Sequence, residues 1–224
     1  MKVLLYDVDF NSEVIIEDGF VLGIECESAS YFSSLIANLK GYCSEHIAIL
    51  GDNGKELNLT RDVLTIIDFY STEQITKAAL SKFYKQMDSV YRDEESFNYV
   101  DKVERVISDL LGTIDFYNMD FEYDVPSTMS SYMKLCDVRL KNYSGGVYED
   151  LVNLATLIGI TKSYKVTTLI NAKSMFTENE LNEIAKSFIY AKQPLILIDN
   201  LLKKEKIEKE KKLVIDADFY DIML

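Results

Sequence analysis

The chain has 224 residues, of which 48% are hydrophobic and 27% are charged, and its formal net charge is −13. This length and apolar content suffice for the packed core of one or two domains in a soluble protein. No stretch approaches the roughly 18 uninterrupted apolar residues of a membrane-spanning helix, and residues 1–10 carry charges where a signal peptide is apolar. We therefore expect a cytoplasmic protein that makes no membrane contact.

Charge is unevenly distributed along the chain. Residues 203–212 contain six lysines and three glutamates, a net charge of +3, which leaves −16 for the rest. Such a run is typical of a solvated helix face or loop. The acidic remainder argues against a protein that coats nucleic acid over its whole surface, because phosphate neutralisation needs clustered Lys and Arg, but a local basic surface stays open.

The N-terminal region predicts antiparallel strands with one helix. Short β-rich runs are separated by turn residues such as Asp18-Gly19, and Asn53-Gly54 is a strong hairpin signal. Strands are expected at 3–8, 14–16, 20–25, 48–50 and 56–59, and a helix at 28–39.

The middle of the chain predicts helices. Apolar residues recur every three or four positions over 96–116, as in an amphipathic helix. Thr60 resembles an N-cap and predicts a helix to Phe69. Further helices are expected at 71–91, 127–136 and 147–158.

The last third predicts strands around a helix. Thr177 to Glu180 has the form of a capping box, which opens a helix to Tyr190. The flanking runs 164–170 and 194–198 are apolar, and the second is apolar on both faces, as in a buried parallel strand. Together they predict a βαβ unit, followed by a short strand near 213–215. The predicted fold is therefore α/β, with a head domain formed by 1–71 and 161–224 and an inserted α-helical subdomain at 72–160.

Three carboxylates, Asp120, Glu122 and Asp124, occupy alternate positions. An extended backbone would hold them on one face at roughly 6–7 Å spacing. At an effective dielectric of about 20, each neighbouring pair repels by roughly 2–3 kcal/mol, and a bound divalent ion would offset this cost. Hard oxygen ligands suit calcium, and no clustered His or Cys offers a site for zinc or copper. A solvated loop or strand edge and the metal pocket of a nuclease remain open as alternatives.

Signatures of catalysis are weak. The segment from Gly51 to Glu56 lacks the glycine spacing and the Ser or Thr of a phosphate-binding loop, so it predicts a hairpin turn instead. His46 is the only histidine, which removes Ser-His-Asp catalysis and most zinc chemistry. The cations Lys134, Arg139 and Lys141 follow the acidic residues and, from the residues alone, are typical of exposed helix and loop positions.

The order and spacing of several segments resemble the CRISPR-associated Csn-two proteins, spacer-acquisition accessory factors of type II-A systems in their short form. The resemblance spans nearly the whole chain, and none of its segments is a strict catalytic motif. It rests on Val100 to Val103, Met119 to Asp124, the spacing from Lys134 to Arg139, Ile170-Asn171 leading to Met175 through Leu181, Leu195 to Asp199, and Asp216 to Tyr220.

The resemblance implies a non-enzymatic homotetrameric ring that binds double-stranded DNA ends, threads the duplex through its central hole and uses calcium ions (Ca²⁺) to shape its subunits. It also implies an α/β head like an ATPase domain without a working nucleotide site, and other CRISPR adaptation proteins as partners. By the same resemblance, the calcium ligands are Asp120, Glu122 and Asp124, and the DNA-binding residues are Lys134, Arg139 and Lys102. Lys141 is also expected to bind DNA, although its position is not a basic one throughout the family.

Two other functions remain as alternatives. One is a metal-dependent nuclease that acts at DNA ends, and the other is a structural adaptor whose acidic exterior docks partner proteins.

Overall fold

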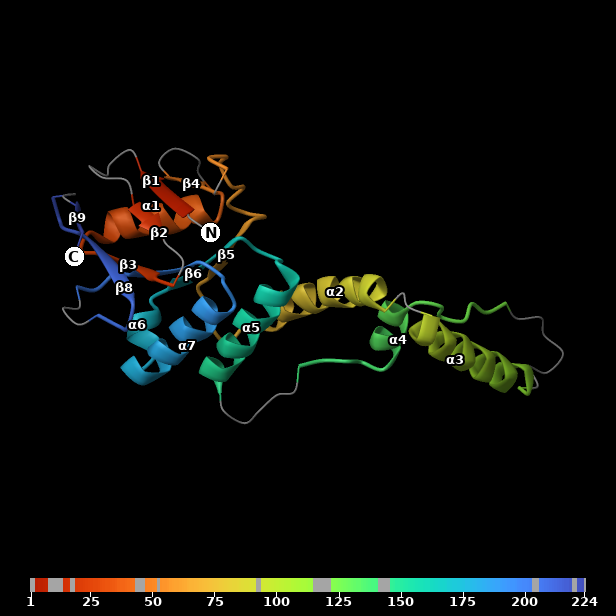
Figure 1. Cartoon of the computed structure of the whole chain (residues 1–224). Helices are drawn as coiled ribbons and strands as arrows, with labels where there is room; N and C mark the ends of the chain where they lie inside the picture. The colour runs from red at the N-terminus through yellow and green to blue at the C-terminus, as the bar shows by residue number, and fades with distance from the viewer. Residues whose placement is uncertain are drawn as a thin grey trace. The chain divides into compact units, whose positions relative to one another are not determined.

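The computed structural model describes ten segments of the chain and divides the chain into two compact units (Figure 1). The first unit, called the sheet unit here, comprises 1–76 and 142–224, and the second, called the helical unit, comprises 77–141. Among the described residues, no helix is both long and apolar enough to cross a membrane. The described segments are 3–7, 14–16, 19–42, 47–51, 53–91, 94–114, 122–140, 146–202, 206–218 and 221–223.

The sheet unit is built on a six-stranded sheet with the order β5-β6-β7-β3-β8-β9. Neighbouring strands are parallel except for β9, which pairs antiparallel with β8. Every residue of β3, β5, β6 and β7 is buried, as expected for parallel strands covered on both faces. The bounds are β3 Val21–Cys26, β5 Val63–Ile66, β6 Val166–Ile170, β7 Leu195–Asp199, β8 Glu210–Ile215 and β9 Asp221–Met223.

A second, antiparallel sheet has the order β2-β1-β4. Its strands are β1 Val3–Asp7, β2 Val14–Ile16 and β4 Ile47–Leu50. The hairpin predicted after β4 is present, because Leu50 bridges Glu56 and the Gly51 amide donates to the Lys55 carbonyl at 2.9 Å. Gly54 has a φ of +67°, which glycine adopts without strain.

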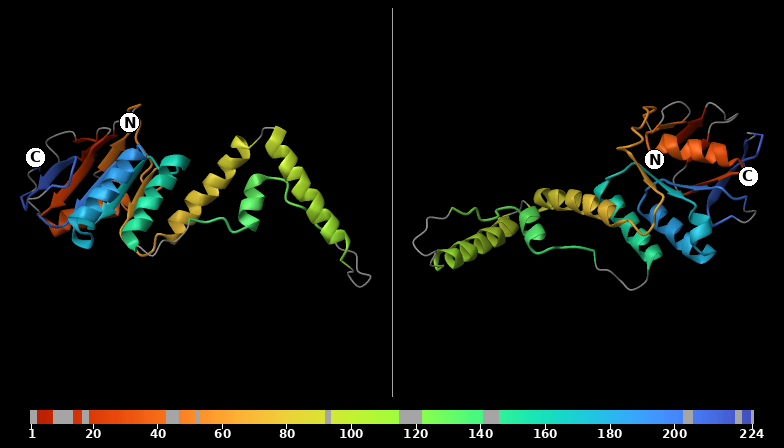
Figure 2. Two further views of the ribbon diagram at one scale, coloured as in Figure 1. Left: turned by 60° about the horizontal axis from the view of Figure 1, so that its bottom comes forward. Right: turned by 180° about the vertical axis from the view of Figure 1, so that it is seen from behind.

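Helices cover both faces of the six-stranded sheet (Figures 1 and 2). Helix α1 (Ala29–Leu39) packs with the small sheet on one face, and α5 (Val147–Thr161) and α7 (Glu178–Tyr190) pack on the other. A short helix, α6 (Ala172–Met175), precedes α7. The predicted capping box is confirmed, because Thr177 and Glu180 exchange hydrogen bonds at the start of α7. With the predicted strands and helices largely in place, the α/β class is confirmed.

The boundary between the units differs from the expected one. Residues 142–160 were expected in the helical subdomain, yet they belong to the sheet unit. The physical reason is that α5 buries Leu151, Leu154 and Ile158 in the same core as Leu181 and Phe188 of α7.

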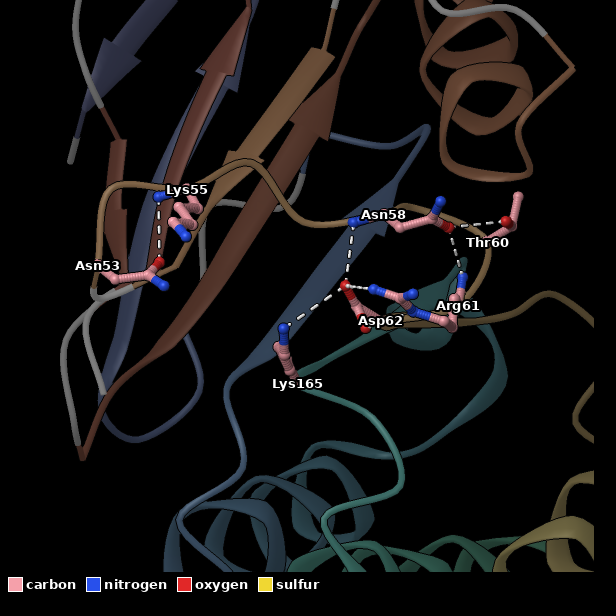
Figure 3. A network of polar contacts seen from close by, with 7 residues as sticks. All are labelled: Asn53, Lys55, Asn58, Thr60, Arg61, Asp62 and Lys165. Atoms are coloured by element: carbon pink, nitrogen blue, oxygen red, sulfur yellow. Dashed lines mark hydrogen bonds and ion pairs between the residues drawn. The ribbon is translucent and has the colours of Figure 1, made fainter.

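The prediction of a helix from Thr60 to Phe69 is wrong. A single turn forms around Asn58, whose side-chain oxygen accepts from the Thr60 hydroxyl at 2.9 Å and the Arg61 amide at 3.0 Å (Figure 3). The chain then enters β5, which pairs with β6. Four consecutive buried residues fit the interior of a sheet, which overrides the local resemblance to a helix start.

Asp62 fixes the entry into β5 (Figure 3). Its carboxylate accepts from the Asn58 amide at 3.1 Å and from the Arg61 guanidinium at 3.2 Å, and it lies 3.5 Å from the Lys165 ammonium before β6. The hydrogen bond from Arg61 lowers the pKa of Asp62 below its ordinary value, although partial burial opposes this.

Buried charges connect β3, β8 and α6. The ammonium of Lys173 lies 2.9 Å from a Glu25 oxygen and also contacts Glu210, and the Lys212 ammonium lies 2.8 Å from the same Glu25 oxygen. All four residues are buried. Gly23 leaves the space for this network, since a Cβ there would lie 1.7 Å from a Glu210 oxygen.

The lysine-rich run does not form the expected solvated helix face or loop over its whole length. Its last residues, Glu210 to Lys212, begin β8, and the Lys212 side chain is 1% exposed. The solvated interpretation is therefore wrong for Lys212, because a buried carboxylate partner allows an ammonium to enter the core. Residues 203–205 lie outside the described part of the chain.

Candidate nucleic-acid interface

The helical unit contains α2 (Glu73–Val90, from Lys77 on), α3 (Glu94–Gly112) and α4 (Met129–Leu135). Helix α4 begins at the N-cap Thr128, whose hydroxyl accepts from the Ser131 amide at 3.2 Å. A second acceptor comes from α2, because an Asp88 oxygen lies 2.7 Å from the Ser130 amide. A carboxylate at a helix N-terminus binds free amides and favours the positive end of the helix dipole.

The sequence-predicted Lys134 lies in the last turn of α4. Its side chain is exposed, and its position near a helix C-terminus is favourable for a cation. Since α4 is held to α2 at its N-terminus, Lys134 is presented on an anchored helix.

Arg139 follows α4 in an irregular segment that is also tied to α2. The Tyr84 hydroxyl donates to the Val138 carbonyl, directly before Arg139. The Arg139 guanidinium lies 3.5 Å from Asp137, and both side chains are more than three-quarters exposed. An ion pair this exposed contributes little, so Arg139 can exchange this partner for a phosphate at little cost.

Of the other two predicted cations, the structure describes only Lys102. Lys102 is exposed on α3, with its ammonium 5.5 Å from the centre of the Tyr99 ring. Lys141 lies outside the described residues.

The structure adds cations that the sequence analysis did not consider. Lys77, Lys82 and Lys85 are exposed on α2, the helix that anchors α4. Their spacing of five and three residues distributes them along α2 and was visible in the sequence, but only the contact with α4 connects them to Lys134.

The acidic residues form no described metal centre. Glu122 and Asp124 are exposed on a segment without regular secondary structure, and Asp120 lies outside the described residues. Among the residues that the structure describes, no three His, Cys, Asp or Glu side chains gather closely enough to hold a metal ion. The donors at Glu122 and Asp124 are hard carboxylate oxygens, which fit calcium.

The carboxyl ends of β3 and β7 are filled by the protein's own polar groups. This edge is where open α/β sheets usually bind ligands. The Asn200 side-chain amide donates to the Cys26 carbonyl at 2.8 Å, and an Asp199 oxygen accepts from the Lys173 amide at 2.9 Å. Only two residues separate β3 from α1, which is too short for a phosphate-binding loop.

The fold and the exposed cations define an α/β protein whose helical unit presents a candidate surface for a polyanion. The profile of the family described as CRISPR-associated protein (Cas_Csn2) matches residues 42–219. The chain therefore belongs to this family, the Csn-two family of the sequence analysis, and has a CRISPR-associated role in defence.

The solved structures to which this chain is similar are distant in sequence. A nucleotide-free ATP-binding cassette from an ABC transporter is 12% identical, with 99% of this chain and 90% of that chain covered and a TM-score of 0.47. The ADP conformation of another ABC-transporter cassette is 11% identical, with 99% and 90% covered and a TM-score of 0.46. An ABC-transporter ATP-binding protein from Pyrococcus furiosus is 10% identical, with 95% and 97% covered and a TM-score of 0.40. A comparison with curated proteins found no significant match.

Proposed function

We propose that the chain is a non-enzymatic, sequence-independent double-stranded DNA-binding protein. In this proposal it assembles into a calcium-stabilised homotetrameric ring that binds DNA ends in the cytoplasm and acts with other CRISPR adaptation proteins in spacer acquisition. Membership of the CRISPR-associated family gives the biological setting.

The observation that carries the DNA-binding part is the anchoring of two exposed cations to one helix. Lys134 lies on α4, which Asp88 of α2 caps, and Arg139 follows the carbonyl that Tyr84 of α2 binds. Anchored cations lose less conformational freedom when they meet a phosphate.

The net charge is compatible with a polyanionic ligand if cations are gathered by assembly. The helical unit holds nine Lys and Arg against twelve Asp and Glu, so it carries −3 of the total −13. A ring repeats each side chain around its symmetry axis, so a few cations per subunit become a positive lining. Contacts of this kind to phosphates carry no base information, which makes the binding independent of sequence.

An exposed apolar stripe on α3 supports self-association. Its members are 44–64% exposed within one chain, and they recur at intervals of three or four residues, which places them on one face of the helix. A second copy of the chain is the proposed occupant of this stripe. The stripe consists of Tyr99, Val103, Val106 and Leu110.

Calcium is proposed to bind through Asp120, Glu122 and Asp124. Carboxylates at alternate positions repel one another, and a divalent cation reverses that repulsion. Backbone carbonyls or waters would complete the six to eight oxygens that calcium takes.

The absence of enzymatic activity is proposed from the edge of the sheet unit. The two-residue connection between β3 and α1 leaves no room for a phosphate-binding loop, and Asn200 bonds to Cys26 across the same edge. The described edge therefore has no loop of the kind that cradles the phosphates of a nucleotide.

A mobility-shift assay with linear duplex tests the proposal. We expect a shift in calcium that weakens in chelator, and an intact duplex after incubation with magnesium or manganese. Cleavage of the duplex would instead support a metal-dependent nuclease. Absence of any shift would leave the acidic structural adaptor as the better function.

A further inference from the structure

A pocket lies between the C-terminal ends of α5 and α7, within the sheet unit. Its volume is about 480 Å³, which falls in the range of ordinary ligand sites. Its residues belong to the sheet unit and are not among the proposed DNA contacts. Its lining consists of Thr156, Gly159, Ile160, Lys162, Ser187, Tyr190, Ala191 and Lys192.

The pocket combines an apolar lining with a cationic rim. Tyr190 is 83% exposed and Ile160 is 54% exposed, although both are large apolar or aromatic side chains. Lys162 and Lys192 are exposed at the rim, and no carboxylate occurs among the described residues that line the pocket. The protein therefore places two cations around an apolar hollow whose described lining contains no carboxylate, in a chain whose net charge is −13.

Both lysines are held in fixed backbone positions. Lys162 ends α5 with a φ of 49°, and its amide donates to the Ile158 carbonyl at 2.7 Å. Lys192 follows α7 with a φ of 51°, and its amide donates to the Ile189 carbonyl at 3.0 Å. Glycine is the usual residue at such helix ends. The conformation alone therefore does not explain why lysine stands at both positions.

Helix α5 and the end of α7 pack closely at the pocket. A Cβ on Gly159 would lie 2.6 Å from the Cβ of Ala191, so a side chain at position 159 has no room there. The Lys162 ammonium donates to the Ala191 carbonyl at 3.3 Å. An ammonium has three donors, so two remain for a ligand.

We infer that this pocket docks a short acidic segment of a partner protein, with an apolar side chain of that segment entering between Ile160 and Tyr190. The partner segment is inferred to be acidic from charge complementarity, because its carboxylates would pair with the two rim lysines. The apolar lining favours a protein segment over a DNA duplex, since a duplex keeps its bases stacked inside and presents charged phosphates on its surface.

The probe for this inference is a fluorescein-labelled peptide of alternating glutamate and leucine, titrated into the full chain. Fluorescence polarisation measures affinity, and isoleucine methyl NMR locates the site. The Ile160 methyl signal is expected to move, whereas that of Ile184, fully buried in α7, stays in place.

The decisive variant is Lys162→Gly combined with Lys192→Gly. Glycine adopts the left-handed conformation at both positions without strain, so the fold is retained while the rim charge is removed. Peptide affinity is expected to fall by about tenfold, and Tyr190→Ser is expected to weaken binding through loss of the aromatic contact. Lys55→Ala, a loss of one exposed lysine in the hairpin turn, serves as the control and keeps full affinity.

Three outcomes would overturn the inference. They are no measurable binding of the peptide, equal affinity in the double glycine variant, and movement of the Ile160 signal by a short DNA duplex instead of the peptide. The inference does not rest on DNA binding, because the proposed DNA contacts belong to the helical unit and are intact in all of these variants.

Discussion

Asp88 of α2 accepts a hydrogen bond from the Ser130 amide at 2.7 Å and so caps the helix that carries Lys134. Replacing it with Ala removes this acceptor while Thr128 stays as the N-cap, and losing a hydrogen bond at the helix start costs about 1 kcal/mol and loosens α4. We expect Asp88→Ala to weaken DNA binding even though the substitution makes the protein less negative. Mobility shifts over a protein titration measure the change.

Asp88→Asn is the matched control, since it removes the same charge but keeps a side-chain oxygen at the cap. Its affinity should equal or exceed that of the wild type. If Asp88→Ala also binds more tightly, charge rather than the placement of α4 governs affinity.

Charge reversal at Lys134 and Arg139 tests the proposed DNA lining. Lys134→Glu with Arg139→Glu should abolish binding yet preserve the oligomer, because both side chains are exposed and make little contribution to folding. In the wild type, the logarithm of the affinity should fall with the logarithm of salt at a slope of about −0.9 per neutralised phosphate. Lys55→Glu with Lys206→Glu, two exposed sites in the sheet unit, provides an equal change of charge. Unchanged affinity in Lys134→Glu with Arg139→Glu would exclude these two residues from the DNA-binding surface.

The apolar stripe of α3 predicts where assembly can be broken. Leu110→Glu should reduce the molar mass in sedimentation equilibrium, because burying a leucine contributes about 1.5–3 kcal/mol and a carboxylate in its place adds a desolvation cost. Asn98→Glu introduces the same residue away from the stripe and should leave the mass unchanged. An intact oligomer in Leu110→Glu would mean that a different surface joins the subunits.

The sequence could predict elements whose signal is local. Leu195 to Ile198 is apolar on both faces, which only a strand covered on both sides requires, and Thr177 with Glu180 marks a helix start by itself. Val63 to Ile66 carries the same kind of apolar run but is only four residues long. A run of that length does not distinguish strand from helix, so the local resemblance to a helix cap misled the prediction there.

The sequence predicted which residue types belong to the candidate site, but not the contacts that position them. Exposure of Lys134 and Arg139 follows from their polar surroundings, but the contact that positions them joins Asp88 to Ser130 across 42 positions. The buried pair of Lys173 and Glu25 is separated by 148 positions. No periodicity encodes such separations, because the tertiary fold creates them.

Lys173 should be essential for the stability of the sheet unit. Burial acts to lower its pKa, but the hydrogen bonds and charges of Glu210 and Glu25 outweigh burial and raise it. Lys173→Met would leave both carboxylates without this ammonium, and we expect a loss of about 3–5 kcal/mol in urea unfolding. Lys55→Met, at an exposed site, should change stability by less than about 0.5 kcal/mol. If Lys173→Met also lowered the stability by less than about 0.5 kcal/mol, the buried network would contribute little to folding.

The lowered pKa of Asp62 predicts that the stability of the protein depends on pH. Its pKa is lowered from an ordinary value of 3.8, first by the hydrogen bond from Arg61. A carboxyl group with a lowered pKa contributes its full stabilisation above the ordinary value and loses it as the pH falls toward the lowered pKa. Asp62→Asn should therefore be less stable than the wild type in urea at about pH 6, with the difference shrinking at about pH 3.

Asp68→Asn is the control for this effect. Asp68 also has a lowered pKa, and its hydrogen bonds among the described residues lie within its own turn, to Tyr70 and Ser71. Asp68→Asn should therefore lower the stability at about pH 6 by less than Asp62→Asn does. A gap between Asp62→Asn and the wild type that widens toward acid would contradict the assignment.

The most direct measurement compares linear duplex with closed circular duplex of the same sequence in a mobility-shift assay with calcium. A ring that threads DNA requires an end, so the linear form should shift and the circle should stay free. Equal binding of both forms would contradict threading and would indicate contact with the outside of the protein.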